Sequence, residues 1–161
     1  MTPDQDTLDD LFIYNEGRLF WRVSLSNRVK VGDEAGRINK GYRMVRLFGK
    51  EHPAHRLIWI LHNGDIPYSF IIDHIDNDSL NNKIENLRLA TYQQNSFNKS
   101  KSKNASSIHK GVVFIPKYNK WQAQVQISGK SFYIGQFTSE SEAKEAYDEV
   151  AKVIFGEFYK A

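Results

Sequence analysis

The sequence predicts an α+β protein of two domains, built from small antiparallel sheets and single helices. Three observations support this class. Residues 12–50 alternate apolar and polar side chains in short runs bounded by turn residues, which predicts β-hairpins. Residues 70–99 have the pattern strand, polar loop, strand and helix. Residues 108–161 show three alternating runs and one amphipathic helical stripe, which predicts a three-stranded antiparallel sheet packed on one helix.

Local patterns place the elements of the first domain. In order, they are a hairpin around Asn15-Glu16-Gly17, a strand over 41–47, a helix over 54–62, strands over 70–73 and 87–90, and a helix over 92–99. Asn63-Gly64 ends the first of these helices, and Thr91 with Gln94 forms a capping box that begins the second.

The second domain has equally local signals. Strands are predicted over 111–115, 121–127 and 131–137, the last two joined across Ser128-Gly129-Lys130. Ser139 and Glu142 form a capping box at the start of the helix, and Gly156 ends it.

The composition is that of a folded, cytoplasmic protein. Of the 161 residues, 40% are hydrophobic and 25% are charged, and no apolar run approaches the length of a membrane span. The acidic N-terminal segment lacks the features of a secretory signal. The chain contains no cysteine, which excludes disulfides and four-cysteine zinc sites and suits a reducing cytosol.

The net charge of +3 is distributed unevenly along the chain. Residues 98–130 contain seven lysines and no acidic residue. Residues 131–161 contain three basic and six acidic residues, and residues 1–97 contain 12 basic and 13 acidic residues. A positive middle between nearly neutral ends is typical of a polyanion-binding stripe, although a solvated linker gives the same counts. We expect a basic linker over 98–107 between domains 1–97 and 108–161.

Polar side chains gather in IIDHIDNDSLNNKIENLRLATYQQN, residues 71–95. Hydrolysis of a phosphodiester requires a base, a cation near the phosphorus and stabilisation of the leaving oxygen. The ordinary pKa of histidine suits His74 to the role of base. Asp73 and Asn95 offer the hard oxygen ligands that Mg²⁺ prefers, and two protein ligands leave positions for water and phosphate.

Residues 55–95 resemble an HNH endonuclease of the phage homing type. The matching residues are His55-Arg56-Leu57, Asp73-His74-Ile75-Asp76, Asn81-Asn82, Asn86-Leu87-Arg88 and Asn95. The resemblance implies a ββα-metal fold over about 70–99, preceded by β-hairpins. It also implies that His74 is the general base and that Asp73 and Asn95 hold one Mg²⁺ or Mn²⁺ ion per active site.

The same resemblance implies that Asn86 orients His74 and holds the loop. His55 and Arg56 match the family as well, either as groups that reach the phosphate or as structural residues. One alternative is a polar turn in which Asp73 caps locally and His74 is a hydrogen-bonded core residue. A geometric condition also applies, because adjacent strand residues face opposite sides: the strand has to end or bend at His74.

The middle strand of the second domain has two chemically different faces. Its apolar residues alternate with Gln122, Gln124 and Gln126, and the next strand adds Ser131 and Tyr133. These side chains donate and accept hydrogen bonds without charge, as the reading of base edges requires. The lysines that we expect to contact phosphates are Lys110, Lys117, Lys120 and Lys130.

Residues 109–158 resemble the DNA-binding domain of plant ethylene-response factors, also called the Apetala-two domain. The shared residues are Lys110-Gly111-Val112, Lys120-Trp121, Tyr133-Ile134-Gly135, Phe137, Ala143, Ala146-Tyr147-Asp148, Ala151 and Phe155-Gly156. Where the plant domain has base-contacting arginines, this chain has Val113, Ile115, Gln126 and Ser131. The resemblance therefore implies DNA binding without the plant target sequence, and Val113 and Ile115 would meet thymine methyl groups. The alternative is a sheet face that only covers the first domain.

Together these features predict a Mg²⁺-dependent endonuclease that acts on double-stranded DNA, by nicking or by double-strand cleavage. Lys99, Lys101 and Lys103 of the linker would follow the DNA backbone. The alternative is a non-catalytic, sequence-specific DNA-binding regulator that retains the HNH fold. The sequence leaves open whether the chain is a monomer or a homodimer, and if it is phage-encoded its compartment is the bacterial host cytoplasm.

Overall fold

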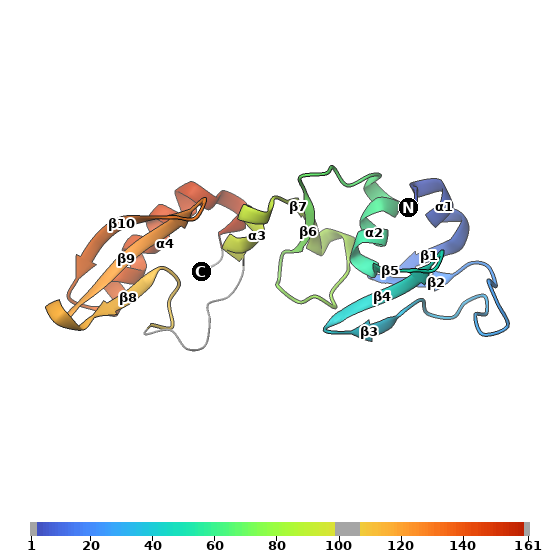
Figure 1. Cartoon of the computed structure of the whole chain (residues 1–161), viewed down its shortest axis with the longest axis horizontal. Helices are drawn as coiled ribbons and strands as arrows, with labels where there is room; N and C mark the ends of the chain where they lie inside the picture. Colours follow the sequence, from blue (N-terminus) through green and yellow to red (C-terminus); the bar gives the residue numbers. More distant parts are fainter. Residues whose placement is uncertain (1–2, 99–106, 160–161) are drawn as a thin grey trace. The chain divides into compact units, whose positions relative to one another are not determined.

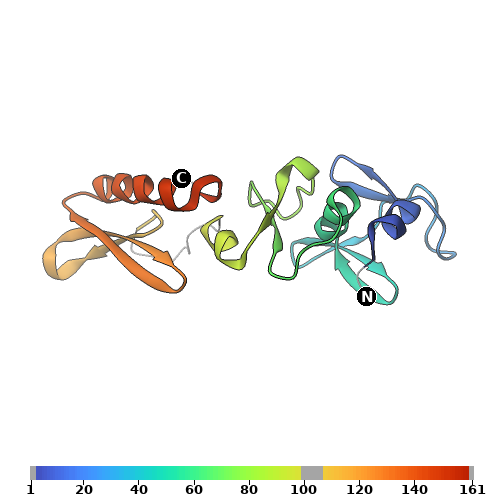
Figure 2. The ribbon, with the colours of Figure 1, turned by 90° about the horizontal axis from the view of Figure 1, so that it is seen from above.

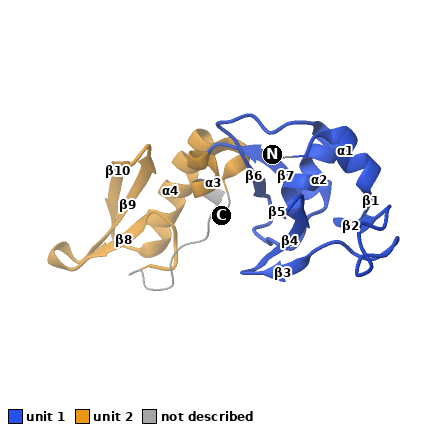
Figure 3. Cartoon of the chain, turned by 45° about the vertical axis from the view of Figure 1, so that its right-hand side comes forward, with its two compact units in different colours: residues 1–91 blue, residues 92–161 orange. Residues whose placement is uncertain are grey.

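The computed structural model describes residues 3–98 and 107–159 of the chain (Figure 1). The chain divides into two units, residues 1–91 and 92–161 (Figure 3). The sequence predicts that the first domain ends at residue 97, whereas unit 1 ends at Thr91. The two differ because the short helix that follows Thr91 groups with the second unit. The predicted linker residues Lys99, Lys101 and Lys103 lie outside the described residues.

The described part of unit 1 contains three small antiparallel sheets and two α-helices. Its elements are α1 (Gln5–Leu11), β1 (Phe12–Asn15), β2 (Arg18–Trp21), β3 (Arg37–Asn39), β4 (Tyr42–Leu47), β5 (Lys50–Pro53), α2 (Ala54–Asn63), β6 (Ile71–His74), the 3₁₀ turn η1 (Ile84–Asn86) and β7 (Leu87–Ala90). The sheets are β1-β2, β3-β4-β5 and β6-β7. The α+β class and the hairpins before the polar loop are therefore observed.

Helix α1 was not predicted from the sequence. Asp4 caps it, because its carboxylate accepts a hydrogen bond from the backbone N–H of Thr7 at 2.9 Å. Leu8 is fully buried. The segment is mostly acidic and polar, and Leu8 is the buried residue of the helix, so its apolar pattern was too short to indicate a helix.

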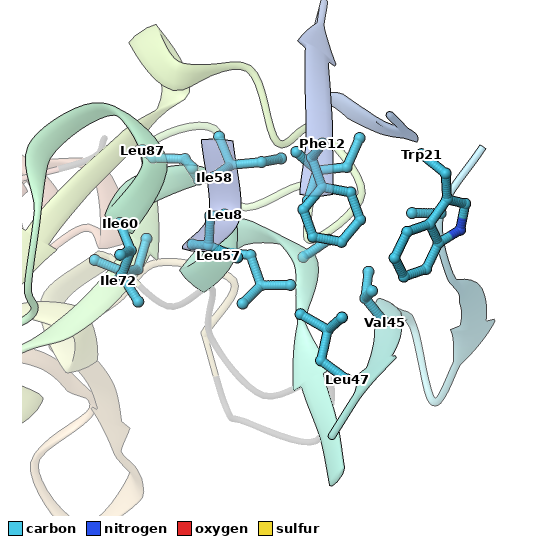
Figure 4. Close-up of a cluster of buried hydrophobic side chains, with 13 residues drawn as sticks. Leu8, Phe12, Trp21, Val45, Leu47, Leu57, Ile58, Ile60, Ile72 and Leu87 are labelled. Atoms are coloured by element: carbon cyan, nitrogen blue, oxygen red, sulfur yellow. The ribbon is translucent and has the colours of Figure 1, made fainter. Parts of the chain in front are cut away.

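The hydrophobic core of unit 1 surrounds helix α2 (Figure 4). Leu57 and Ile58 of α2 are buried, and they belong to one cluster with side chains from α1 and from all three sheets. The residues labelled in Figure 4 are Leu8, Phe12, Trp21, Val45, Leu47, Leu57, Ile58, Ile60, Ile72 and Leu87. Because Ile72 lies on β6 and Leu87 on β7, this core attaches the β6-β7 pair to the N-terminal hairpins.

Unit 2 has the predicted meander and helix. Its elements are α3 (Tyr92–Asn98), β8 (Val112–Ile115), the 3₁₀ turn η2 (Pro116–Tyr118), β9 (Lys120–Ile127), β10 (Lys130–Phe137), α4 (Glu140–Phe155) and the 3₁₀ turn η3 (Gly156–Phe158). The antiparallel sheet has the order β10-β9-β8, and α4 runs along one of its faces (Figure 2). The predicted capping box is present, with Ser139 and Glu142 each bonding to the other's backbone N–H.

Among residues 3–98 and 107–159, no helix is both long enough and apolar enough to cross a lipid bilayer.

Candidate active site

The β6-β7 ladder places Asp73 directly opposite Arg88. Nε of Arg88 donates a hydrogen bond to Oδ2 of Asp73 at 3.0 Å, and Nη2 of Arg88 forms an ion pair with the same oxygen at 2.9 Å. The side chain of Asp73 is 4% exposed and that of Arg88 is 13% exposed. A buried carboxylate requires such a partner, since an isolated charge in the interior is strongly unfavourable.

His74 follows Asp73 on β6 and faces the opposite side. Its Nε2 lies 2.9 Å from the side-chain oxygen of Asn82, and its ring stands edge-on to His55 of α2 with centroids 4.9 Å apart. With Asn82 as acceptor, Nε2 carries the proton in the neutral ring. Nδ1 is then the basic nitrogen.

Strand β6 ends at His74, although the backbone N–H of Ile75 still donates to the carbonyl of Asn86 at 2.9 Å. Asp73 and His74 therefore leave the end of one regular strand on opposite faces.

His55 is a buried neutral residue at the start of α2. Burial, followed by the charges of His74 and Arg56, lowers the pKa of His55 to about 3. The ring of Tyr42 lies on another side of it, 5.7 Å away between centroids. His55 is thus uncharged near neutral pH, and its ring packs against that of His74. Arg56, the next residue on α2, is partly exposed.

The loop after β6 is held by Asn86 and Asp76. The amide nitrogen of Asn86 donates to Oδ1 of Asp76 at 2.9 Å and to the carbonyl of Asn81 at 2.8 Å. Its amide oxygen accepts from the backbone N–H of Asp76 at 3.1 Å. The side chain of Asn81 donates to Oδ2 of Asp76 at 2.7 Å. Asn86 therefore fixes the shape of the loop.

Asn82, whose side-chain oxygen contacts Nε2 of His74, had no role predicted from the sequence. Asn82 is 3% exposed, and it follows Asn81, whose side chain turns to Asp76 instead. The only sequence signal for Asn82 is its membership of the Asn81-Asn82 doublet. Which of the two asparagines reaches the histidine depends on the path of the loop, which the spacing of residues does not define.

The chemistry of two predicted ligands suits a divalent metal ion. Asp73 and Asn95 offer a carboxylate and an amide oxygen, which are ligands for Mg²⁺ or Mn²⁺. Asp73 belongs to unit 1, whereas Asn95 lies on α3 in unit 2. In residues 3–98 and 107–159, no group of three or more His, Asp or Glu side chains is arranged to hold an ion. The donor types thus fit an ion completed by water and phosphate, and the pairing of Asp73 with Asn95 stays a prediction.

The β8-β9-β10 sheet of unit 2 has one face against α4 and one face away from it. Val112, Ala123 and Val125 are buried on the α4 side. In register, Val113 pairs with Gln122, and Ser131 pairs with Gln126. The face away from α4 consequently has Val113, Ile115, Lys120, Gln122, Gln124, Gln126, Ser131 and Tyr133.

The lysines of unit 2 have different environments. Lys117, Lys120 and Lys130 are exposed. Lys110 is partly buried, its Nζ donates to the carbonyl of Ser96 at 3.1 Å, and burial lowers the pKa of its ammonium group. It lines a pocket of about 430 Å³ together with Gln124, Gln126 and Ser131 of the sheet and with Tyr147 and Phe155 of α4. Lys110 is thus placed among the side chains predicted to read bases.

The Asp73-His74 pair thus lies at the end of the two-stranded β6-β7 sheet, beside an asparagine-rich loop. The family model described as "HNH endonuclease" matches residues 52–97. This segment contains the Asp73-His74 pair and the loop.

Two relatives extend the similarity beyond this segment. "Uncharacterized HNH endonuclease L560" of Acanthamoeba polyphaga mimivirus is 42% identical over 119 residues, which is 73% of this chain and 60% of that protein. "Protein 3.8" of Escherichia phage T7 is 36% identical over 93 residues, 58% of this chain and 74% of that protein. The chain thus spans about three-fifths of the length of the mimivirus relative. No solved structure is significantly similar to the chain. Residues 52–97 therefore form an HNH endonuclease domain by similarity.

Proposed function

We propose that this protein is a metal-dependent endonuclease of the homing HNH type, which hydrolyses phosphodiester bonds in double-stranded DNA. The observation on which this depends is the buried His74, whose Nε2 is held by Asn82 at 2.9 Å at the end of the strand that also presents Asp73. Both residues lie within the segment that matches the family.

His74 is the general base of this reaction. Because Nε2 donates to Asn82, Nδ1 is the atom that takes the proton from the attacking water. The imidazolium that forms keeps its hydrogen bond to the Asn82 oxygen, and such bonds to charged groups are stronger than neutral ones. The new phosphorus–oxygen bond forms as the bond to the 3′ oxygen breaks. The family resemblance implies 5′-phosphate and 3′-hydroxyl ends.

Asp73 and Asn95 would hold the divalent ion. When bound, Mg²⁺ or Mn²⁺ would neutralise charge on the phosphate and the leaving oxygen. Arg88 has a second role in this proposal, because it fixes Oδ2 of Asp73 and thereby orients the carboxylate. Asn86 preserves the loop on which Asn82 lies. His55 gives His74 a neutral neighbour, so that the two rings do not compete for a proton.

We further propose that unit 2 binds the DNA beside the cleavage site. The uncharged side chains of Gln122, Gln124 and Gln126, on the face of the sheet away from α4, suit contact with base edges in a major groove. The exposed Lys117, Lys120 and Lys130 would contact phosphates. The similarity to the Apetala-two domain supports this role, although the residues at the plant domain's arginine positions imply a different target sequence.

Cleavage of DNA tests the proposal. The full-length chain is incubated with supercoiled plasmids and with phage genomic DNA in Mg²⁺, with and without EDTA, and the ends are mapped by sequencing. We expect breakage that requires the metal and that His74→Ala abolishes, while DNA binding in a gel-shift assay is retained. DNA binding without any breakage would support a non-catalytic regulator instead. Breakage that survives EDTA or His74→Ala would refute the assigned chemistry.

A further inference from the structure

We propose that the turn of the β1-β2 hairpin is a positioning element for His74. Gly17 and Tyr14 hold the backbone of residues 82–84, and that backbone presents the Asn82 side chain to the imidazole. The inference rests on the proposed function, in which His74 is the base, but the contacts themselves involve only described residues of unit 1.

Gly17 lies directly against the peptide bond between Asn82 and Lys83. A Cβ atom on Gly17 would lie 2.8 Å from the nitrogen of Lys83 and 2.9 Å from the carbonyl carbon of Asn82, both of which are backbone atoms. Gly17 is buried although the neighbouring turn residue Glu16 is exposed, because the 82–83 backbone covers it. The turn therefore touches the very residue whose side chain holds His74.

The conformation of the turn adds to this requirement. Glu16 and Gly17 both have positive φ, 46° and 82°, as a two-residue hairpin of this twist needs. Glycine serves two purposes here, because it accepts the backbone conformation and it allows the close approach. These two purposes can be separated experimentally, since other glycines of the chain have a similar φ in open space.

Tyr14 provides a second contact from the same hairpin. Its hydroxyl oxygen accepts a hydrogen bond from the backbone N–H of Ile84 at 3.1 Å. Its ring stands edge-on to His62 with centroids 4.5 Å apart, and Nδ1 of His62 donates to the carbonyl of Ile58 at 2.8 Å. The hydroxyl thus has a fixed place relative to α2, the helix that also provides His55.

The other end of the loop is attached to a different hairpin. Ser79 donates from its hydroxyl to the carbonyl of Gly41, in the turn between β3 and β4, at 2.6 Å. The exposed pair of Glu16 and Lys83, with 2.6 Å between Oε2 and Nζ, adds to the first attachment but is open to solvent and so contributes little. Asn82 lies beside the attachment at Gly17, which is packed more closely than the attachment at Ser79. A shift of the β1-β2 turn is therefore transmitted to the His74–Asn82 hydrogen bond.

Two variants with matched controls test this inference. Gly17→Ala introduces the clash, and Gly49→Ala is its control, because Gly49 has φ +78° and a Cβ atom added to it would meet no other atom within 4 Å. Tyr14→Phe removes one oxygen atom and keeps the ring. Tyr68→Phe is its control, since Tyr68 is fully exposed. Tyr14→Phe also keeps the inference testable if Gly17→Ala does not fold.

The first readout is the tautomer of His74 in the full chain, from the ¹⁵N chemical shifts of its imidazole without DNA. We expect a smaller population of the Nε2–H tautomer in Gly17→Ala and Tyr14→Phe, and wild-type shifts in both controls. The second readout is cleavage, where we expect kcat to fall at least tenfold in Gly17→Ala with KM unchanged within twofold. Shifts and kcat equal to those of the controls would overturn the inference. If the wild type does not cleave, the proposed function fails, and the tautomer measurement still decides the positioning role.

Discussion

The side-chain oxygen of Asn82 lies 2.9 Å from Nε2 of His74, and both residues are buried. This contact determines which ring nitrogen is basic, and it remains when the ring gains a proton. The catalytic proposal therefore depends on Asn82 as well as on His74.

The first prediction concerns Asn82→Ala. A hydrogen bond to a charged group contributes about 1.5–3 kcal/mol, which corresponds to about 10- to 150-fold in rate. We expect kcat to fall by that factor while KM for DNA is unchanged. The control is Asn81→Ala, because Asn81 donates to Asp76 rather than to His74. Steady-state cleavage of a mapped site measures both, and an equal loss in the two variants would contradict the assigned role of Asn82.

The second prediction concerns the Asp73–Arg88 pair. Removal of one partner of a buried ion pair leaves an uncompensated charge and typically costs about 3–5 kcal/mol. We expect Asp73→Ala to lower the free energy of unfolding of unit 1 by this amount, and the double variant Asp73→Leu/Arg88→Leu to recover most of it. Urea denaturation measures the effect, in a Trp121→Phe background so that Trp21 and Trp59 report unit 1.

The control for this pair is the exposed pair of Arg37 and Glu51, whose closest atoms are 3.3 Å apart. Glu51→Ala should change the free energy of unfolding by less than about 1 kcal/mol, because solvent screens such pairs. Should Asp73→Ala cost no more than Glu51→Ala, the buried pair would not be the structural support described above.

The third prediction concerns the pH dependence of stability. The pKa of His55 is about 3 in the folded chain, against 6.5 for an ordinary histidine. The unfolded state therefore binds a proton below pH 6.5 that the folded state does not bind until near pH 3. Stability from this residue is fully present above pH 6.5 and is lost as the pH falls, at up to about 1.4 kcal/mol per pH unit.

His55→Phe tests this dependence because it keeps an aromatic ring against His74. Urea denaturation at a series of pH values between 7 and 4 should give a shallower decline for His55→Phe than for the wild type. Identical slopes would show that His55 takes up its proton equally in both states. An NMR titration of the wild type should likewise find no change in the His55 ring over this pH range.

Features that depend on neighbouring residues could be predicted from the sequence. The hairpin at Asn15-Glu16-Gly17, the capping box of Ser139 and Glu142, and the three-strand meander all formed where local patterns placed them. Each is specified by a few adjacent residues, so that no tertiary contact is needed to choose between alternatives.

Features that depend on contacts between distant residues could not be predicted from the sequence. The partner of Asp73 is set by the register of β6 on β7, and the choice of Asn82 over Asn81 is set by a turn that lies more than sixty residues earlier, at Gly17. The sequence indicated that Asp73, His74 and the asparagines belong together because of their family pattern. The family pattern implied that Asn86 holds the loop, but it did not indicate that Asp76 is its partner or that Asn82 contacts the histidine.

The last prediction concerns DNA recognition by unit 2 and rests on the proposed function. Lys130 is exposed at the connection between β9 and β10, whereas Gln124 lies on the sheet face away from α4. If lysines contact phosphates and glutamines contact bases, the two types of substitution should have different signatures. Lys130→Gln should weaken binding to all sequences alike and lower the slope of log K against log salt concentration by about 1.

Gln124→Ala should leave that slope unchanged and reduce the preference for the target over random DNA, by about 1–3 kcal/mol if its contact is bidentate. The control is Lys152→Gln, which removes a charge from α4, on the other side of the sheet. Fluorescence anisotropy at several salt concentrations, with a cleaved site and a scrambled duplex, measures all three variants. A slope change as large in Lys152→Gln as in Lys130→Gln would mean that net charge rather than the position of Lys130 controls binding, because a phosphate contact at a defined site releases its counterion only from the face that touches DNA.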